Sequence, residues 1–367
     1  MSANPNWKGE LQQLLRVHNT LHASRSKGVS HRTMEARAES LFRSFKLLRH
    51  LGYQLGPASL GGRHVRHLVL HWCGLAAPPD APPPTPQAPP PHAYSAAYIQ
   101  QQLSFLRALA GWIGKPGLVM PAERYLSPEQ RPLVRRHLAA SHDHSLSARH
   151  TGAGDVLSRV AAIDPWVGVQ LQLMWAFGLR RKEAVMFCPQ LADVPAWALP
   201  ANADATTGYV SFLRVKRGTK GGRLRYTAVR NDVQRSALAA AKALVRSPGD
   251  HVGRPGRTLK QALERFKYVM RRAGLTRDQL GATSHALRHE FANDLYFELA
   301  GVPSPVRGGL GLEPEAMLEA YLEVARQLGH GRPQISGAYL GKMAAPPAAR
   351  APQGLAPGRP RGRGEGA

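Results

Sequence analysis

Apolar residues recur with helical spacing along the first 140 residues. Over residues 30–52, for example, Leu41, Phe45 and Leu48 fall on one face of a helix. Ser95 begins another such segment and is a favourable N-cap. The pattern predicts helices over residues 7–21, 30–52, 63–72 and 95–114, and therefore a helical domain at 1–140.

A proline-rich insert interrupts this helical domain. Residues 78–91 read PPDAPPPTPQAPPP and contain nine prolines. Proline lacks the backbone N–H that helix and sheet interiors need, so an extended polyproline loop is expected here.

A polar, glycine-containing stretch follows the helical domain. We place a linker at residues 141–155, in which HDH at 142–144 is expected to be solvated. A second domain then spans residues 156–343. Residues 344–367 are rich in Pro, Gly and Arg and are expected to be a disordered basic tail.

The second domain mixes two periodicities. An apolar helix is expected over residues 164–187, and an amphipathic helix over 257–275. Between them, residues 209–229 have two β-prone arms around a glycine-containing turn, which predicts a hairpin. The expected fold class is mainly α with a small antiparallel β-sheet.

Net charge is the most informative feature of the composition. The chain has 49 Lys and Arg against 24 Asp and Glu, a formal net charge of +25. This excess favours a polyanion such as nucleic acid as the partner. An anionic membrane surface fits less well, since the basic residues are not confined to one amphipathic helix or terminal cluster. A compositional bias towards Arg, Ala and Pro is the third explanation.

Targeting signals are not evident in the sequence. No run of 18 apolar residues occurs, and the first residues lack the apolar core of a signal peptide. The two cysteines, Cys73 and Cys188, do not suggest a disulfide framework. We therefore expect a cytoplasmic protein in a reducing compartment, with no membrane partner.

Six polar residues of the second domain together suit phosphodiester chemistry: Arg180, Lys220, His285, Arg288, His330 and Tyr339. Two guanidinium groups can grip phosphate oxygens and offset the charge of the transition state. A tyrosine can form a phosphotyrosine ester, and a lysine on a hairpin can protonate the leaving sugar oxygen.

Metal chemistry is less favoured by the sequence. No carboxylate cluster recurs at ligand spacing. His64, His67 and His71 share a helix face but have no carboxylate nearby, so a DNA-facing or half-buried helix is expected there.

Three sequence boxes resemble those of the tyrosine recombinase (phage integrase) family. GLRRKE around Arg180 is similar to the first arginine box, and HALRH with Arg288 is similar to the H-x-L-R-H box. LGHGRPQISGAYL is similar to the L-G-H box, with Tyr339 nine residues after His330. The resemblance covers roughly residues 155–343, and the boxes are specific only in combination.

The resemblance implies a two-domain DNA clamp, with a core-binding domain at 1–140 and a catalytic domain at 156–343. Tyr339 would attack the scissile phosphate to form a 3′-phosphotyrosyl link, and Lys220 would protonate the 5′ oxygen. The phosphate would be held by Arg180, Arg288, His285 and His330.

The resemblance also implies a set of partners. It implies double-stranded DNA, a homo-tetramer on paired DNA sites, accessory DNA-bending proteins, and no metal or nucleotide cofactor. The activity would be site-specific recombination for integration or excision of a mobile element. A type IB topoisomerase and a non-catalytic DNA-binding protein are the rival functions.

Some assignments have competitors, and the chain departs from the family pattern. Arg181 competes with Arg180 and Lys216 with Lys220, while His289 is expected to be a buried structural residue. The segment between Arg288 and His330 is longer than usual in the family. It predicts an extra loop and helix within residues 296–325.

Overall fold

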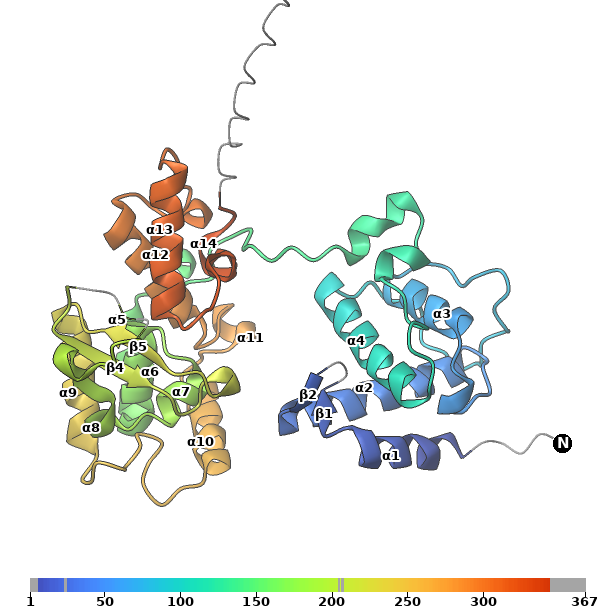
Figure 1. Cartoon of the computed structure of the whole chain (residues 1–367), viewed down its shortest axis with the longest axis horizontal. Coiled ribbons are helices and arrows are strands. Elements are labelled where there is room, and N and C mark those ends of the chain that lie inside the picture. Colours follow the sequence, from blue (N-terminus) through green and yellow to red (C-terminus); the bar gives the residue numbers. More distant parts are fainter. Residues whose placement is uncertain (1–5, 23–24, 204, 206–207, 344–367) are drawn as a thin grey trace, which may run out of the picture. The chain divides into compact units, whose positions relative to one another are not determined.

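The computed structural model describes residues 6–22, 25–203, 205 and 208–343. The chain divides into two compact units, Met1–His137 and Leu138–Ala367 (Figure 1). The predicted disordered tail at 344–367 lies outside the described residues.

The first unit is helical, as predicted. Its elements are α1 (Trp7–His18), a short hairpin of β1 (Leu21–His22) and β2 (Arg25–Gly28), α2 (His31–His50), α3 (Gly62–Trp72) and α4 (Ala96–Trp112). Ser30 and Ser95 cap α2 and α4 by accepting backbone N–H bonds through their hydroxyl groups. The predicted faces of these helices meet in one core, in which Leu41, Phe45 and Leu48 are completely buried.

The proline-rich insert runs without regular helix or strand, as its composition predicts. It is nevertheless attached to the helices. The backbone N–H of Thr85 donates to the carbonyl of His50 at 2.7 Å, and that of His92 donates to the carbonyl of His71 at 3.0 Å. The insert therefore follows the C-terminal ends of α2 and α3.

The three histidines of α3 are buried. Of the two alternatives predicted for this helix, DNA-facing or half-buried, the structure supports the buried one. His64, His67 and His71 are each at most 5% exposed, so this face of α3 is not free to contact DNA. Tyr53 packs edge-on against His64 and His67, and burial lowers the pKa of all three histidines.

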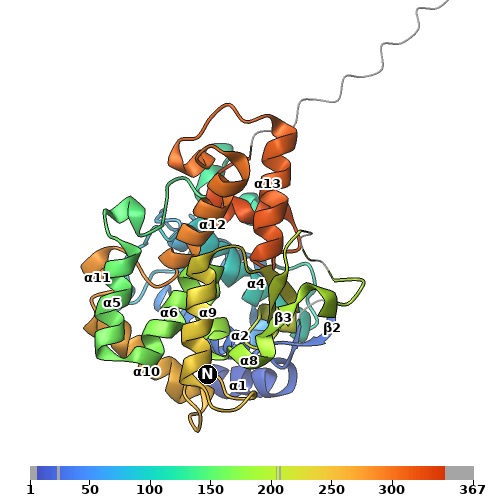
Figure 2. The same ribbon diagram turned by 90° about the vertical axis from the view of Figure 1, so that its left-hand side faces the viewer.

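The second unit combines helices with a small antiparallel sheet, which confirms the predicted fold class (Figure 2). Its α-helices are α5 (Ala153–Ile163), α6 (Pro165–Phe177), α7 (Arg181–Val185), α8 (Pro189–Ala192), α9 (Asp232–Leu244), α10 (Leu259–Arg272), α11 (Arg277–Leu280), α12 (Ala286–Ala300), α13 (Pro314–Gln327) and α14 (Gly337–Leu340). The extra loop and helix expected within 296–325 are the 3₁₀ turn η7 (Pro305–Arg307) and α13.

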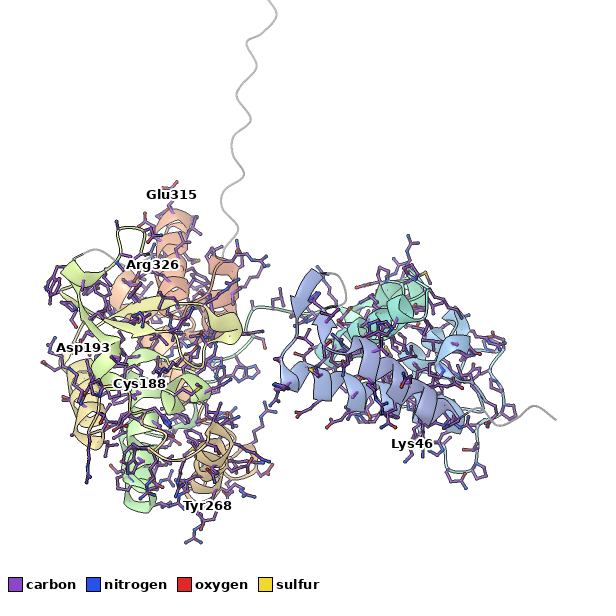
Figure 3. The ribbon with its side chains drawn as sticks, turned by 60° about the horizontal axis from the view of Figure 1, so that its bottom comes forward. Lys46, Cys188, Asp193, Tyr268, Glu315 and Arg326 are labelled. Carbon is purple, nitrogen blue, oxygen red and sulfur yellow. The ribbon has the colours of Figure 1, made fainter. Side chains whose placement is uncertain are left out.

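The sheet contains the predicted hairpin and one further strand. Strands β4 (Ser211–Val215) and β5 (Arg225–Ala228) form the hairpin, and β3 (Asp193–Pro195) pairs with the outer edge of β4. Asp193, labelled in Figure 3, forms an ion pair with Lys242 of α9 at 2.5 Å. The short β3 was not predicted, because three residues are too few for a period-2 pattern.

Two apolar clusters of the second unit position the elements of the site. The larger cluster packs α6, α7, α9 and α10, and includes the fully buried Phe177 and Leu179. A separate cluster joins α12, α13 and α14 around Tyr296 and Tyr321. Among the described residues, no helix is both long and apolar enough to cross a lipid bilayer.

Candidate active site

Arg288 is the centre of the site. It lies in the first turn of α12 and is completely buried. Its Nε donates to the phenolic oxygen of Tyr339 at 3.0 Å, while Nη1 donates to the carbonyl of Gly178 and Nη2 to that of Leu328. Burial lowers the pKa of Arg288 to about 10, so the guanidinium remains charged at neutral pH.

Gly178 allows the backbone to approach this guanidinium. It ends α6 with a φ of +59°, in the left-handed region that favours glycine. A Cβ at this position would lie 2.5 Å from Phe291 and 2.7 Å from Leu328. The FGLRR sequence after α6 therefore needs glycine before Leu179 for two independent reasons.

Tyr339 lies on the short helix α14 and is only 7% exposed. Three histidine rings surround it. The His330 ring is stacked on it at 5.6 Å between centroids, and His289 and His285 lie at 4.8 and 6.0 Å. The buried His289, expected to be structural, thus contacts the ring of the candidate nucleophile.

His330 is held between backbone and arginine. The backbone N–H of His330 donates to the carbonyl of Ala325 at 2.8 Å, and the ring Nε2 lies 3.2 Å from Nη2 of Arg288. Because an arginine can only donate, Nε2 must be the acceptor, so the ring is neutral with its proton on Nδ1. Burial and the charges of Arg288 and Arg180 lower the pKa of His330 to about 3, which agrees with a neutral ring.

The glycine that precedes His330 is needed for packing. Gly329 has a φ of +68°, and a Cβ there would lie 2.7 Å from the Cδ of Arg225. The LGH sequence therefore brings the turn close to strand β5.

His285 is the N-cap residue of α12 and lies one turn before Arg288. The residue as a whole is exposed. Desolvation of its ring and the nearby charges of Arg288 and Arg180 nevertheless lower the pKa of His285 to about 4. At neutral pH it is therefore an uncharged hydrogen-bonding group at the edge of the site.

Arg180 and Glu183 belong to a buried ion-pair network. Arg180 donates from Nη1 to Glu183 at 2.7 Å, and Glu183 in turn accepts the backbone N–H of Arg180 at 2.8 Å. Glu183 also accepts two bonds from Arg225, at 3.1 and 2.9 Å. Burial raises the pKa of Glu183, but the two arginines outweigh this and bring it to about 2.

Arg225 was missed by sequence reasoning. It lies in strand β5, whose four residues are all buried, and is itself 7% exposed. An arginine between apolar strand residues was the available signal, since a buried guanidinium requires a carboxylate partner. That partner is Glu183, a residue that the sequence placed beside Arg180.

Lys220 lies at the turn of the β4–β5 hairpin and is exposed. No hydrogen bond or ion pair joins it to the other candidate residues in the described part of the chain. The competitors Arg181 and Lys216 are exposed as well. The structure therefore brings together five of the six predicted residues, with Lys220 on the neighbouring hairpin.

The HDH stretch was predicted to be solvated, which is confirmed for His142 and His144, both exposed, and is wrong for Asp143 between them. Asp143 accepts hydrogen bonds from Ser145 and Arg307, and its side chain is 11% exposed. His142 is exposed, and His144 packs edge-on against His289 at 5.3 Å.

Electrostatically the site suits an anion. Three guanidinium groups, those of Arg180, Arg225 and Arg288, converge around one carboxylate, that of Glu183. Within residues 6–343 as described, no group of three or more His, Cys, Asp or Glu side chains is arranged to hold a metal ion. The arrangement can therefore bind a phosphate and place a phenol next to it.

One family model matches part of the second unit. Residues 139–294 match a family model described as Integrase. No curated protein matches the chain.

Several solved structures resemble the chain. A lambda integrase dimer bound to a COC′ core site has a TM-score of 0.48 at 13% identity, covering 90% of this chain and 76% of that one. The Tn1549 transposon integrase in complex with circular intermediate DNA also has a TM-score of 0.48 at 13% identity, covering 91% and 96%. The XerH site-specific recombinase bound to its difH substrate has a TM-score of 0.43 at 14% identity, covering 92% and 87%.

Proposed function

We propose that this chain, which belongs to the integrase family, is a site-specific DNA recombinase that breaks and rejoins DNA strands through Tyr339. One observation supports this most directly. The phenolic oxygen of Tyr339 is bonded to the fully buried guanidinium of Arg288, beside His330 and close to Arg180. A nucleophile and the charges needed by a phosphoryl transition state therefore share one site.

In the cleavage step, the oxygen of Tyr339 attacks the scissile phosphorus. A bond forms between the phenolic oxygen and phosphorus while the bond from phosphorus to the 5′ oxygen breaks. The phenolic proton passes to water, and the leaving 5′ oxygen takes a proton from Lys220, which is left neutral. The products are a 3′-phosphotyrosyl ester and a free 5′-hydroxyl.

Rejoining is the reverse reaction with a new partner. A 5′-hydroxyl of another strand attacks the phosphotyrosyl phosphorus and gives its proton to the neutral Lys220, while the bond from phosphorus to the phenolic oxygen breaks and the phenolate takes a proton from water. The phosphodiester energy is kept in the ester throughout, so the reaction needs no nucleotide to drive it.

The arginines stabilise the charge that accumulates on the phosphoryl oxygens. Arg288 is oriented before substrate arrives, because two backbone carbonyls and Tyr339 fix its plane. Arg180 is oriented by Glu183. Such prearranged donors cost little reorganisation during reaction, which is why they can lower the barrier.

The histidines act as neutral donors and acceptors rather than as charges. The pKa of His285 is lowered to about 4 and that of His330 to about 3 by burial and by the neighbouring arginines. Each can therefore hydrogen-bond a phosphate oxygen and relay a proton without first losing one at neutral pH.

The partner is double-stranded DNA, which the net charge of +25 suits. We also propose a homo-tetramer on two paired sites, accessory DNA-bending proteins, and action in the cytoplasm on the DNA of a mobile element. The first unit would supply further helices that contact the duplex.

Covalent trapping tests the function. Wild type and Tyr339→Phe are offered nicked duplexes that tile the DNA flanking the gene, with chelator present, and are analysed on denaturing gels. A protein–DNA band with wild type and none with the variant is expected, mapping to a 3′-phosphate at one short sequence. Bands at many unrelated sequences would indicate a topoisomerase, and tight binding with no band would indicate a non-catalytic DNA-binding protein.

A further inference from the structure

Arg307 joins three parts of the second unit. It lies in η7, within the segment that is longer than the family pattern. Its guanidinium bonds to two carboxylates of α12 and to three side chains of the segment that follows the first unit, at 2.9 to 3.3 Å: Glu290, Asp294, Asp143, Ser145 and Ser147. All of its donor nitrogens are therefore used.

This hub is mostly shielded from solvent. The side chains of Arg307, Asp143 and Glu290 are 23%, 11% and 10% exposed, whereas that of Asp294 is 54% exposed. Burial on this scale indicates that Arg307 holds protein segments together.

The same loop supports the segment that carries Tyr339. Gly341, two residues after Tyr339, has a φ of +96°, and a Cβ there would lie 2.9 Å from the backbone nitrogen of Val306. Ser304 donates to Asn293, which donates to the carbonyls of His289 at 2.8 Å and Tyr339 at 3.4 Å. Ser304 and Asn293 are completely buried.

The segment that follows the first unit reaches the nucleophile helix as well. The backbone N–H of Ala140 donates to the carbonyl of Gly337, the first residue of α14, at 2.8 Å. Farther along, the N–H of Ser147 donates to Glu290 at 3.0 Å. Residues 138–147 and η7 therefore contact α14 and its supports from two directions, and Arg307 joins the two.

We propose that Arg307 is a positioning residue that fixes α14, and with it the Tyr339 hydroxyl, by tying the segment after the first unit to α12 and to the extra loop. This inference rests on the proposed function, since it assigns Tyr339 the role of nucleophile. It gives the extra loop a task in catalysis. The nucleophile is held in part by the chain segment that leads directly from the first unit.

The experiment measures cleavage and local order separately, on the full chain. Arg307→Ala, Arg307→Lys and the control Arg235→Ala, an exposed arginine of α9, are compared with wild type. The readouts are the single-turnover rate of adduct formation on the mapped site, DNA affinity, and amide hydrogen exchange of peptides from α14 and from α10. Exchange reports local opening segment by segment.

Arg307→Ala is expected to slow cleavage by about 100-fold, because small misplacement of a reacting group is costly. DNA affinity and α10 exchange should match wild type, while α14 exchanges faster. Arg307→Lys keeps one ion pair and should recover part of the rate. Wild-type cleavage in Arg307→Ala, or equal loss of protection in α10 and α14, would overturn the inference.

A second variant covers the case in which Arg307→Ala does not accumulate as folded protein. Ser304→Ala removes the hydroxyl that holds Asn293 and should give the same pattern with a smaller loss of rate. Unchanged cleavage and α14 exchange in Ser304→Ala would also overturn the inference. If wild type forms no adduct at all, the proposed function fails, whereas the exchange comparison still decides whether Arg307 orders α14.

Discussion

The Nε of Arg288 donates to the hydroxyl of Tyr339 across 3.0 Å, and neither side chain has more than 7% of its surface exposed. The two residues are 51 positions apart in the chain and belong to different helices. In the proposed function, this contact would place the phosphate-binding charge beside the nucleophile before DNA arrives. It also means that a change in the arginine disturbs both.

Replacement of Arg288 by lysine is therefore expected to be severe. Lysine keeps the charge but cannot donate simultaneously to Tyr339, Gly178 and Leu328 in one plane. Loss of prearranged donors of this kind typically slows the chemical step by about 100- to 1000-fold. Single-turnover adduct formation would be measured at a temperature where circular dichroism shows a folded chain, with Arg235→Lys as the control. Cleavage within a few-fold of wild type would contradict this role.

Gly329 and Gly331 flank His330 and form a matched pair. Gly329→Ala adds a Cβ at positive φ, 2.7 Å from Arg225, so it should destabilise the chain by about 1–3 kcal/mol and displace His330. At Gly331 the φ is ordinary and the nearest atom, 3.1 Å away, is the flexible end of Arg223. Gly331→Ala should thus be tolerated.

Thermal unfolding and adduct formation would be measured for both glycine variants. The expected order is wild type, then Gly331→Ala close to it, then Gly329→Ala well below. Equal effects of the two substitutions would show that close packing against Arg225 does not explain the glycine before His330.

The sequence predicted helices well where apolar spacing and caps agreed, but the single helix expected over residues 164–187 is wrong. It is two helices, α6 and α7, because Gly178 ends α6 at a positive φ. Residues 30–52 gave α2 with its cap at Ser30, and 95–114 gave α4 with its cap at Ser95. In both segments the serine N-cap and the helical spacing of the apolar residues agree with the face that the fold buries. The hairpin and the amphipathic α10 followed for the same reason.

Long-range pairing was not predictable in this way. Nothing local to Arg225 names Glu183 as its partner 42 residues away, and nothing in HDH marks Asp143 as the partner of Arg307. The HDH stretch was expected to be solvated because it lies in a polar linker. Polar residues can instead be buried when a distant arginine satisfies them, and that arginine is visible only in the fold.

Acid should weaken the catalytic unit through its histidines. The pKa of His330 is lowered by burial and by Arg288 to about 3 in the folded chain, against about 6.5 in the unfolded chain. Between these values the unfolded state binds the additional proton, so stability falls as pH drops from about 6.5 towards 3. His285, with a pKa of about 4, contributes in the same direction.

Replacing His330 by asparagine should remove the one proton that the unfolded chain binds at this residue and the folded chain does not. Near pH 5 the slope of unfolding free energy against pH should decrease by about 1.4 kcal/mol per pH unit relative to wild type. Denaturant unfolding at pH 4.5, 5.0, 5.5 and 7.5 measures this, with His150→Asn as an exposed-histidine control. An unchanged slope in His330→Asn would show that the ring is protonated in the folded chain.

The role of Lys220 can be separated from that of its neighbour Lys216. Both are exposed on the β4–β5 hairpin, but Lys220 is at the turn. If Lys220 protonates the leaving 5′ oxygen, Lys220→Ala should slow cleavage by about 100-fold or more, while Lys216→Ala stays near wild type. In a substrate whose bridging 5′ oxygen is replaced by sulfur, the leaving group does not need a proton, because a thiolate is a far better leaving group than an alkoxide.

On the sulfur-substituted DNA, Lys220→Ala should therefore cleave nearly as fast as wild type. If the cleavage rate of Lys220→Ala recovers on sulfur-substituted DNA and not on ordinary DNA, Lys220 is assigned to proton transfer. A defect that persists on sulfur-substituted DNA would assign Lys220 to phosphate binding instead. A defect in Lys216→Ala that sulfur relieves would transfer the role to Lys216, four residues earlier on the same hairpin.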